Sequence, residues 1–180
     1  LNNCLNIVYM TKDIKIYNCG FNEIKTYFLV ILFVIGNIAL PQLCHLIPNG
    51  GKILLPIYFF TFVASYKYGF KVGLMTAILS PVVNSLLFGM PAMSLLPAIL
   101  TKSIVLAVTA SFVANKTKKI SLLNLLMIVL IYQVVGTLAE WAMTSSFYVA
   151  IQDFRLGISG MIVQILGVYF ILTHFDRSKS

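Results

Sequence analysis

Charged residues are scarce in this chain of 180 residues: they make up 10% of it, against about 25% in a typical soluble domain. Hydrophobic residues make up 59%, and the mean hydropathy is +0.94. A water-soluble globule of this composition would not have enough polar residues to cover its surface. The composition therefore predicts an integral membrane protein, and no long polar block is present to form an attached soluble catalytic domain.

The residue types and motifs that commonly build catalytic or metal sites are also few. Five acidic residues and two histidines leave little for metal ligation. The three cysteines, Cys4, Cys19 and Cys44, form no CxxC pair. No HExxH or GxSxG motif is present, and the stretch from Asn49 to Lys52 lacks the other residues of a P-loop. We therefore expect a protein that binds or conducts a small molecule, without catalytic residues, a metal or a cofactor.

Long uncharged runs predict an all-α membrane bundle. A helix of about 20 mostly apolar residues crosses about 30 Å of hydrocarbon. Three runs come close to this length: 26–44, 120–139 and 156–175. Each of them is expected to form one transmembrane helix.

A further uncharged run, 72–101, is too long for one helix. It contains Gly89-Met90-Pro91, and glycine and proline together end helices and start turns. We therefore predict one helix at 69–88 and another at 93–115.

The segment 53–66 is short for a membrane span. It reaches the required length only if the Lys67 side chain extends to the membrane surface. With this segment included, the sequence predicts six transmembrane helices within 25–176. A polar cytoplasmic tail at 1–24 precedes them, and a short cytoplasmic tail at 177–180 follows.

Lysine and arginine fall almost entirely on alternate connections between the predicted helices. The net charge of +8 would suggest a nucleic-acid partner in a soluble protein, but cytoplasmic loops of membrane proteins carry an excess of these residues. Ten of the thirteen lie in the two tails, with Lys25 counted at the end of the first, and in the second and fourth loops, and two lie in the first and fifth loops. The distribution predicts that both termini are cytoplasmic, and we expect no nucleic-acid partner.

Polar side chains within the predicted spans concentrate in the outer half of the bundle. Lys102 and Glu140 are the charged residues inside the spans. A lone charge there costs about 2.5–3.5 kcal/mol on insertion scales, so each requires a partner or a ligand. The asymmetry predicts a polar pocket open to the outside. The candidate substrate-binding residues come from five predicted helices: Asn84, Lys102, Glu140, Trp141, Tyr58 and Gln164.

Each candidate also has an ordinary structural interpretation. A Lys102–Glu140 pair would serve equally to lock two helices together, and Asn84 and Gln133 are as easily interhelical hydrogen-bond partners as ligand contacts. Trp141 fits an aromatic belt at the membrane surface. If Glu140 neutralises Lys102, a neutral or zwitterionic ligand fits the site as well as an anion does. The sequence leaves these alternatives open.

Short motifs between the first loop and the fourth predicted helix resemble a known family. In chain order they are Gly-Lys-Ile-Leu-Leu-Pro at 51–56, Tyr-Gly-Phe-Lys-Val-Gly-Leu at 68–74, Ser80-Pro81, Gly89-Met90-Pro91 and Pro97. Together with six helices in 180 residues, their order and spacing resemble the substrate-binding S component of energy-coupling factor (ECF) vitamin transporters. The local resemblance spans residues 51–97.

The resemblance implies a substrate-capture subunit in a bacterial cell membrane. Such a subunit binds a small water-soluble vitamin or precursor from outside, and it docks on a transmembrane coupling protein with two ATPase subunits that hydrolyse the ATP. This chain departs from the family pattern at three places. Relatives tend to carry Met-His where it has Ile57-Tyr58, and an acid where it has Lys102. Their Ala-x-x-x-Ala docking face on the first helix is replaced by Gly36 and Ala39.

Two other functions are compatible with the same sequence. A non-transporting scaffold of a cell-wall or cell-shape complex shares the size and six-helix topology, but it would have little reason to gather polar residues at outer depth. A membrane enzyme using Lys102 and Glu140 as an acid–base pair is a third interpretation, although no nucleophile or metal set accompanies the pair.

Overall fold

The computed structural model describes residues 12–17, 20–44, 56–151, 154–155 and 157–177. A 3-10 turn, η1 (Pro56–Tyr58), leads into α4. The helices of the described part are α2 (Ile24–Cys44), α4 (Phe59–Tyr68), α5 (Phe70–Phe88), α6 (Leu96–Thr117), α7 (Leu122–Thr144), α8 (Phe147–Ala150) and α10 (Ile158–Arg177).

Each of the six segments predicted as helices is helical over most of its described residues, and residues 53–55 of the second segment lie outside the described part. Four of them, α2, α5, α6 and α7, are long and apolar enough to cross a membrane, and α10 contains a shorter apolar stretch at Ile158–His174. These helices are those of a membrane protein. α4 has 10 residues, or about 15 Å of helix, so the second predicted span is the shortest of the six. The orientation of the bundle in the membrane stays a prediction.

The connection between α5 and α6 differs from the prediction in one detail: α6 begins at Leu96 and not at Met93. The residues before Leu96 form a turn, which Ser85 holds against α5 by donating its hydroxyl hydrogen to the Pro91 carbonyl at 2.8 Å. The predicted break itself is confirmed. Gly89 ends α5 with a φ of 65°, a left-handed conformation that glycine adopts without strain.

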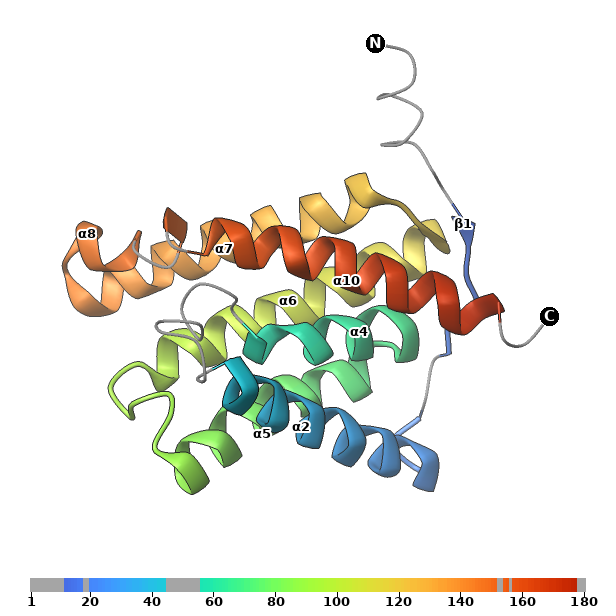
Figure 1. Ribbon diagram of the computed structural model, residues 1–180, viewed down its shortest axis with the longest axis horizontal. Helices are drawn as coiled ribbons and strands as arrows, with labels where there is room; N and C mark the ends of the chain where they lie inside the picture. Colours follow the sequence, from blue (N-terminus) through green and yellow to red (C-terminus); the bar gives the residue numbers. More distant parts are fainter. Residues whose placement is uncertain (1–11, 18–19, 45–55, 152–153, 156, 178–180) are drawn as a thin grey trace, which may run out of the picture.

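α4 lies at the centre of the bundle, where it contacts α2, α5, α6 and α10. Figure 1 shows α7 and α10 on one side of it and α2 and α5 on the other. Glycines allow three of these neighbours to approach closely. An added Cβ at Gly36 or Gly167 would lie 2.9 or 2.7 Å from a phenylalanine ring of α4, and one at Gly73 would overlap Ser65. Small residues at such contacts are a common means of packing helices in membranes.

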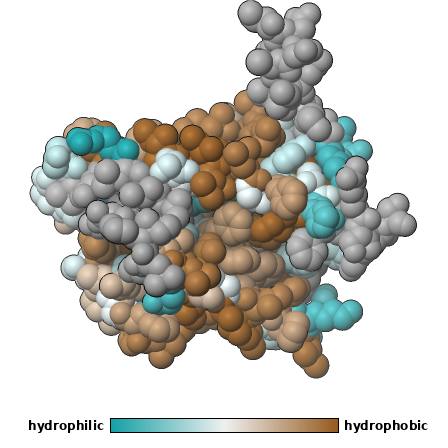
Figure 2. All heavy atoms as spheres, viewed as in Figure 1, coloured by the Kyte–Doolittle hydropathy of each residue, from teal (hydrophilic) through white to brown (hydrophobic). Residues whose placement is uncertain are grey.

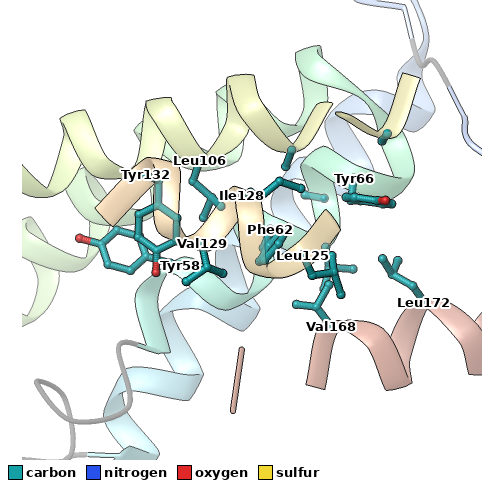
Figure 3. Close-up of a cluster of buried hydrophobic side chains, with 14 of the residues drawn as sticks. Tyr58, Phe62, Tyr66, Leu106, Leu125, Ile128, Val129, Tyr132, Val168 and Leu172 are labelled. Carbon is teal, nitrogen blue, oxygen red and sulfur yellow. The ribbon is translucent and has the colours of Figure 1, made fainter. Parts of the chain in front are cut away.

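The apolar core continues from α4 toward α6, α7 and α10. Phe62 of α4 is fully buried among Leu106, Ile128 and Val168, one from each of these helices. Figure 3 shows this cluster extending from Tyr58 at one end of α4 to Tyr66 near the other end. The core therefore runs the whole length of the short central helix.

The N-terminal segment packs against one end of the bundle. β1 (Lys12–Asp13) pairs antiparallel with β2 (Lys119–Ile120) between α6 and α7. The Tyr17 N–H donates to the Lys67 carbonyl at 2.8 Å, and the β1 lysine donates its ammonium hydrogen to the Thr173 carbonyl at 3.0 Å. The described part of the N-terminal segment, the end of α4 and the turn after α6 therefore meet at this end, next to the last turns of α10. The all-α prediction omitted this ladder, because two strands of two residues each give no sequence pattern.

The outer surface of the long helices is apolar. Figure 2 shows hydrophobic residues over most of the face in view. Large exposed apolar side chains occur on every long helix: Phe28 and Ile31 on α2, Leu86 on α5, Phe112 on α6, Val134 on α7, and Phe170 on α10. Exposed apolar area of this extent requires a cover of lipid or protein.

Candidate functional site

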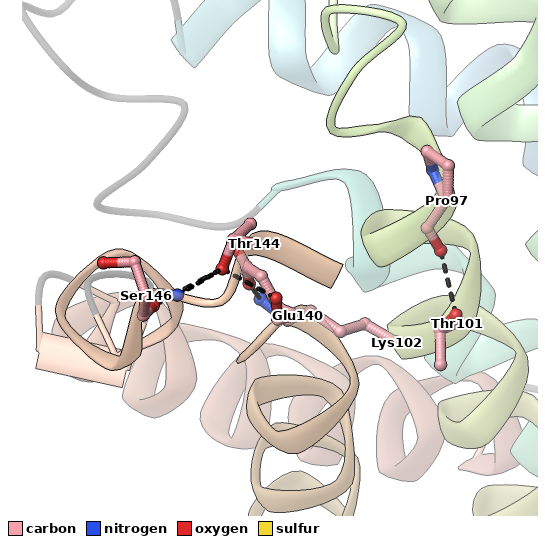
Figure 4. Close-up of polar contacts among 6 residues, drawn as sticks. All are labelled: Pro97, Thr101, Lys102, Glu140, Thr144 and Ser146. Atoms are coloured by element: carbon pink, nitrogen blue, oxygen red, sulfur yellow. Dashed lines mark hydrogen bonds and ion pairs between the residues drawn. The ribbon is translucent and has the colours of Figure 1, made fainter. Parts of the chain in front are cut away.

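Lys102 and Glu140 form an ion pair inside the bundle, between α6 and α7. The Lys102 Nζ lies 2.6 Å from the Glu140 Oε2, and the two side chains are 1% and 7% exposed. Figure 4 shows the lysine extending from α6 to the last turns of α7. The two charges that the sequence places within the spans therefore neutralise each other in the interior.

Gly136 provides the space for this pair. A Cβ at Gly136 would overlap the aliphatic stem of Lys102, so the stem crosses the α7 backbone one turn before Glu140. α7 ends soon afterwards: the Thr144 hydroxyl donates to the Glu140 carbonyl at 2.8 Å (Figure 4), and Ser145 turns the chain with a φ of 53°. The ion pair thus lies toward the end of the bundle that is opposite to β1.

Polar groups without a hydrogen-bond partner also lie on α6 and α7. In the described part of the chain they are both side-chain polar atoms of Gln133, the Ser103 hydroxyl and the Thr137 hydroxyl. Thr137 lies one turn before Glu140 on α7 and Gln133 two turns before it, so both lie on the side of α7 that carries Glu140. Ser103 follows Lys102 on the neighbouring helix α6. Native proteins pair most of their buried polar groups, so this cluster requires an explanation.

A second polar group joins η1, α7 and α10. The Tyr58 and Tyr132 rings lie with their centroids 5.5 Å apart, and Figure 3 shows the two rings side by side. The Tyr132 hydroxyl donates to the Gln164 Oε1 at 2.8 Å. All three side chains are buried. The structure therefore brings two of the candidates, Tyr58 and Gln164, together through Tyr132, which the sequence analysis did not single out.

Asn84 lies on another pair of helices. Its side chain is buried, and its Oδ1 accepts a long hydrogen bond of 3.5 Å from the Gln42 Nε2 of α2. Asn84 occupies the last turns of α5, and Gln42 those of α2. This contact gives Asn84 an interhelical partner, as the structural interpretation expected, and its role toward a ligand stays a prediction.

Trp141 is separated from the ion pair although it follows Glu140 in the chain. Its side chain is 46% exposed and its ring contacts the Phe147 ring edge to face at 5.6 Å between centroids. Consecutive helical residues point about 100° apart, so a buried Glu140 places Trp141 on the outer surface. Tyr148 is exposed beside them. This arrangement matches the aromatic-belt interpretation.

Asn37 of α2 is a polar residue that the sequence analysis did not consider. It is fully buried, and its amide donates to the Thr61 hydroxyl at 2.9 Å and to the Ser80 hydroxyl at 3.1 Å. Its oxygen accepts from the Phe60 N–H at 3.0 Å. Asn37 therefore joins α2, α4 and α5 with all its polar atoms in use. An asparagine in the middle of an uncharged run was the available signal.

The described site suits recognition of a small molecule. It combines a neutralised ion pair toward one end of the bundle with two buried hydroxyls, an unpaired amide and two neighbouring tyrosine rings, and the amide and one of these rings lie at the middle of α7. Low-dielectric surroundings strengthen hydrogen bonds to such groups. The described residues contain no cluster of three His, Cys, Asp or Glu side chains placed to hold a metal.

Comparison with known proteins assigns no family: no family model, no curated protein and no solved structure matches the chain. Its function is therefore argued from the sequence patterns and the geometry of the site.

Proposed function

We propose that this chain is the substrate-capture subunit of an ECF-type importer in a bacterial cell membrane. It binds a small water-soluble vitamin or vitamin precursor in an outward-facing polar pocket. After docking on a coupling protein with two ATPase subunits, it releases the substrate inside. The observation that carries the proposal is the buried Lys102–Glu140 pair toward one end of the bundle, with unpaired polar side chains on the same two helices.

The energetic cost of that concentration supports a binding role. A buried ion pair is weak evidence for stability, because apolar side chains of similar size are often at least as stabilising. The unpaired hydroxyls and amide beside it add a further cost. A purely structural bundle would be more stable without these groups, whereas a binding protein recovers their cost when the ligand arrives.

The positions of the basic residues support the direction of binding. The N-terminal segment and the turn after α6, which carry Lys12, Lys15, Lys118 and Lys119, pack together at the β1 end. By the positive-inside rule this end faces the cytoplasm. The polar cluster near the opposite end then faces outward, where a scarce nutrient must be captured.

The first experiment is affinity purification of the protein from its native membrane in a gentle detergent, with identification of the proteins that accompany it. Recovery of a transmembrane coupling protein and two ATPases is the expected result. Recovery of cell-wall enzymes instead would contradict the proposal and favour the scaffold.

Ligand binding tests the other half of the proposal. The purified protein is heated with each member of a panel of water-soluble vitamins and their precursors, and its Tm is measured. At least one compound should raise the Tm of the wild type and have a smaller effect on a Lys102→Met/Glu140→Gln double variant. A panel without any effect on the wild type would count against substrate capture.

A further inference from the structure

The Gln133 amide differs from the other buried amides of the described bundle. Its side chain is 1% exposed, yet neither its nitrogen nor its oxygen has a hydrogen-bond partner among the described residues. Asn37 uses both ends of its amide, and the Gln164 oxygen accepts from Tyr132. The buried amides of Asn37 and Gln164 therefore have hydrogen-bond partners on neighbouring helices. Gln133 has no such partner among the described residues, so its amide does not join helices in this way.

Two further unpaired groups accompany Gln133. The Ser103 and Thr137 hydroxyl oxygens are buried and have no partner in the described part of the chain. Thr137 lies one helical turn after Gln133 on α7, and Ser103 follows Lys102 on α6, whose stem crosses α7 at Gly136 between them. Three side chains on two packed helices thus offer unpaired donors and acceptors, and two of them lie within two turns of Glu140 on α7.

The chemistry of these groups selects the kind of partner. A primary amide presents an N–H donor and a carbonyl acceptor side by side, and serine and threonine hydroxyls both donate and accept. A carboxylate would satisfy only the donors and would lie near the charge of Glu140. An ammonium would satisfy only the acceptors and would lie near Lys102. Because the ion pair is already neutralised, a neutral group with adjacent donor and acceptor fits best.

We propose that Gln133, Ser103 and Thr137 bind a neutral small molecule through a cis-amide edge, such as that of a lactam, a cyclic urea or a pyrimidinone ring. The Gln133 amide pairs with this edge through two hydrogen bonds, and the two hydroxyls bind its remaining polar atoms. This assignment names the substrate class of the proposed transporter and rests on that function for its biological meaning.

The test measures Tm for the purified full chain in detergent, with probes that differ in hydrogen-bonding capacity. The probes are 2-piperidone and uracil, which carry a cis-amide edge, cyclohexanone, which only accepts, and acetate, which is an anion. We expect 2-piperidone and uracil at millimolar concentration to raise the Tm of the wild type. Gln133→Leu should abolish this response, and cyclohexanone and acetate should change neither protein.

The stability of the variants without any probe supplies a second readout. Gln133→Leu removes an unpaired buried amide, so its Tm should equal or exceed that of the wild type. Asn37→Leu is the matched control: it leaves Thr61 and Ser80 without their partner, so it should lower the Tm and keep the probe response. If Gln133→Leu lowers the Tm as Asn37→Leu does, or fails to fold, Gln133 is a structural residue hydrated by buried water, and the assignment is wrong.

The remaining outcomes are also decisive. An equal response of both proteins to the cis-amide probes, no response of the wild type, or a larger response to acetate would each overturn the proposed ligand class. The co-purification experiment reports independently on the importer. If the ATPases co-purify and no cis-amide probe raises the Tm, the transport function is supported and the proposed ligand class is wrong. If the cis-amide probes raise the Tm and no ATPase co-purifies, the binding site is supported and the importer is not.

Discussion

Removing either partner of the Lys102–Glu140 pair would leave a charge buried without its counterion. We expect each of the single variants, Lys102→Met and Glu140→Gln, to lower the free energy of unfolding by about 3–5 kcal/mol. The double variant should recover much of this loss, because both charges are then gone. Unfolding by denaturant in detergent micelles measures all three.

The exposed Lys119–Asp13 contact supplies the control for this comparison. Its ammonium and carboxylate lie 3.8 Å apart and both side chains are exposed. Ion pairs of this kind contribute about 0–1 kcal/mol, so Lys119→Met should have little effect. A double variant at 102 and 140 that is no more stable than the single variants would show that the two groups stabilise the bundle through other contacts.

The contact between α4 and α5 depends on a single glycine. An added Cβ at Gly73 would lie within 2.7 Å of the Ser65 Cα, and a backbone atom cannot move aside as the end of a flexible side chain can. We expect Gly73→Ala to push the two helices apart and to cost about 1–3 kcal/mol, as overpacking usually does. Thermal unfolding in detergent measures the loss.

Gly20 provides a matched glycine outside the bundle. An added Cβ there would meet its nearest atom at an ordinary 3.5 Å, so Gly20→Ala should leave the Tm nearly unchanged. Equal effects of the two substitutions would mean that α4 and α5 are not packed as closely as the structure has them.

The attachment of the N-terminal segment depends on Ile14, which is buried in the core. Its N–H donates to the Lys118 carbonyl at 3.3 Å, and the Tyr17 N–H donates to the Lys67 carbonyl. Ile14→Ser should release this segment, because it removes the apolar contact that holds the short ladder in place. Hydrogen exchange of the Ile14 and Tyr17 amides should then become faster, whereas the exposed substitution Lys15→Ser, which keeps Ile14 in the core, should leave the Ile14 rate unchanged.

The whole bundle has two chemically different ends, and the basic end should face the cytoplasm. In a variant with Cys4, Cys19 and Cys44 replaced by serine, an added Ser94→Cys lies in the exposed turn before α6, and Lys15→Cys lies near β1. The first should react with a membrane-impermeant maleimide in intact cells. The second should react only after the membrane is permeabilised, and the opposite pattern would invert the proposed direction of binding.

The positions of the helices could be predicted from the sequence, because an uncharged run of span length has few alternatives to a helix in lipid. The break at Gly89 was also predictable, because glycine and proline together end helices. The later start of α6 was not predictable. It accompanies the hydrogen bond from Ser85 to the Pro91 carbonyl, and no pattern in the sequence indicates that these two residues are in contact.

The candidate site was predictable only in part. Two charges within the spans indicated Lys102 and Glu140, because isolated charges are costly in the membrane. Nothing in the sequence distinguished Asn37, whose polar atoms are all paired, from Gln133, whose polar atoms are not. Both are amides in uncharged runs, and the groups that pair with Asn37 come from other helices, which the sequence does not reveal.

Composition and the spacing of charges by themselves determined that this is a helical membrane protein and which segments form its helices, because these properties depend on the solvent and on local backbone hydrogen bonding. The tertiary structure alone decided which polar groups meet. It paired Lys102 with Glu140, placed Trp141 on the outer surface and left Gln133 unpaired in the interior, because helix rotation and interhelical distance fix those contacts and neither is encoded in a local run of residues.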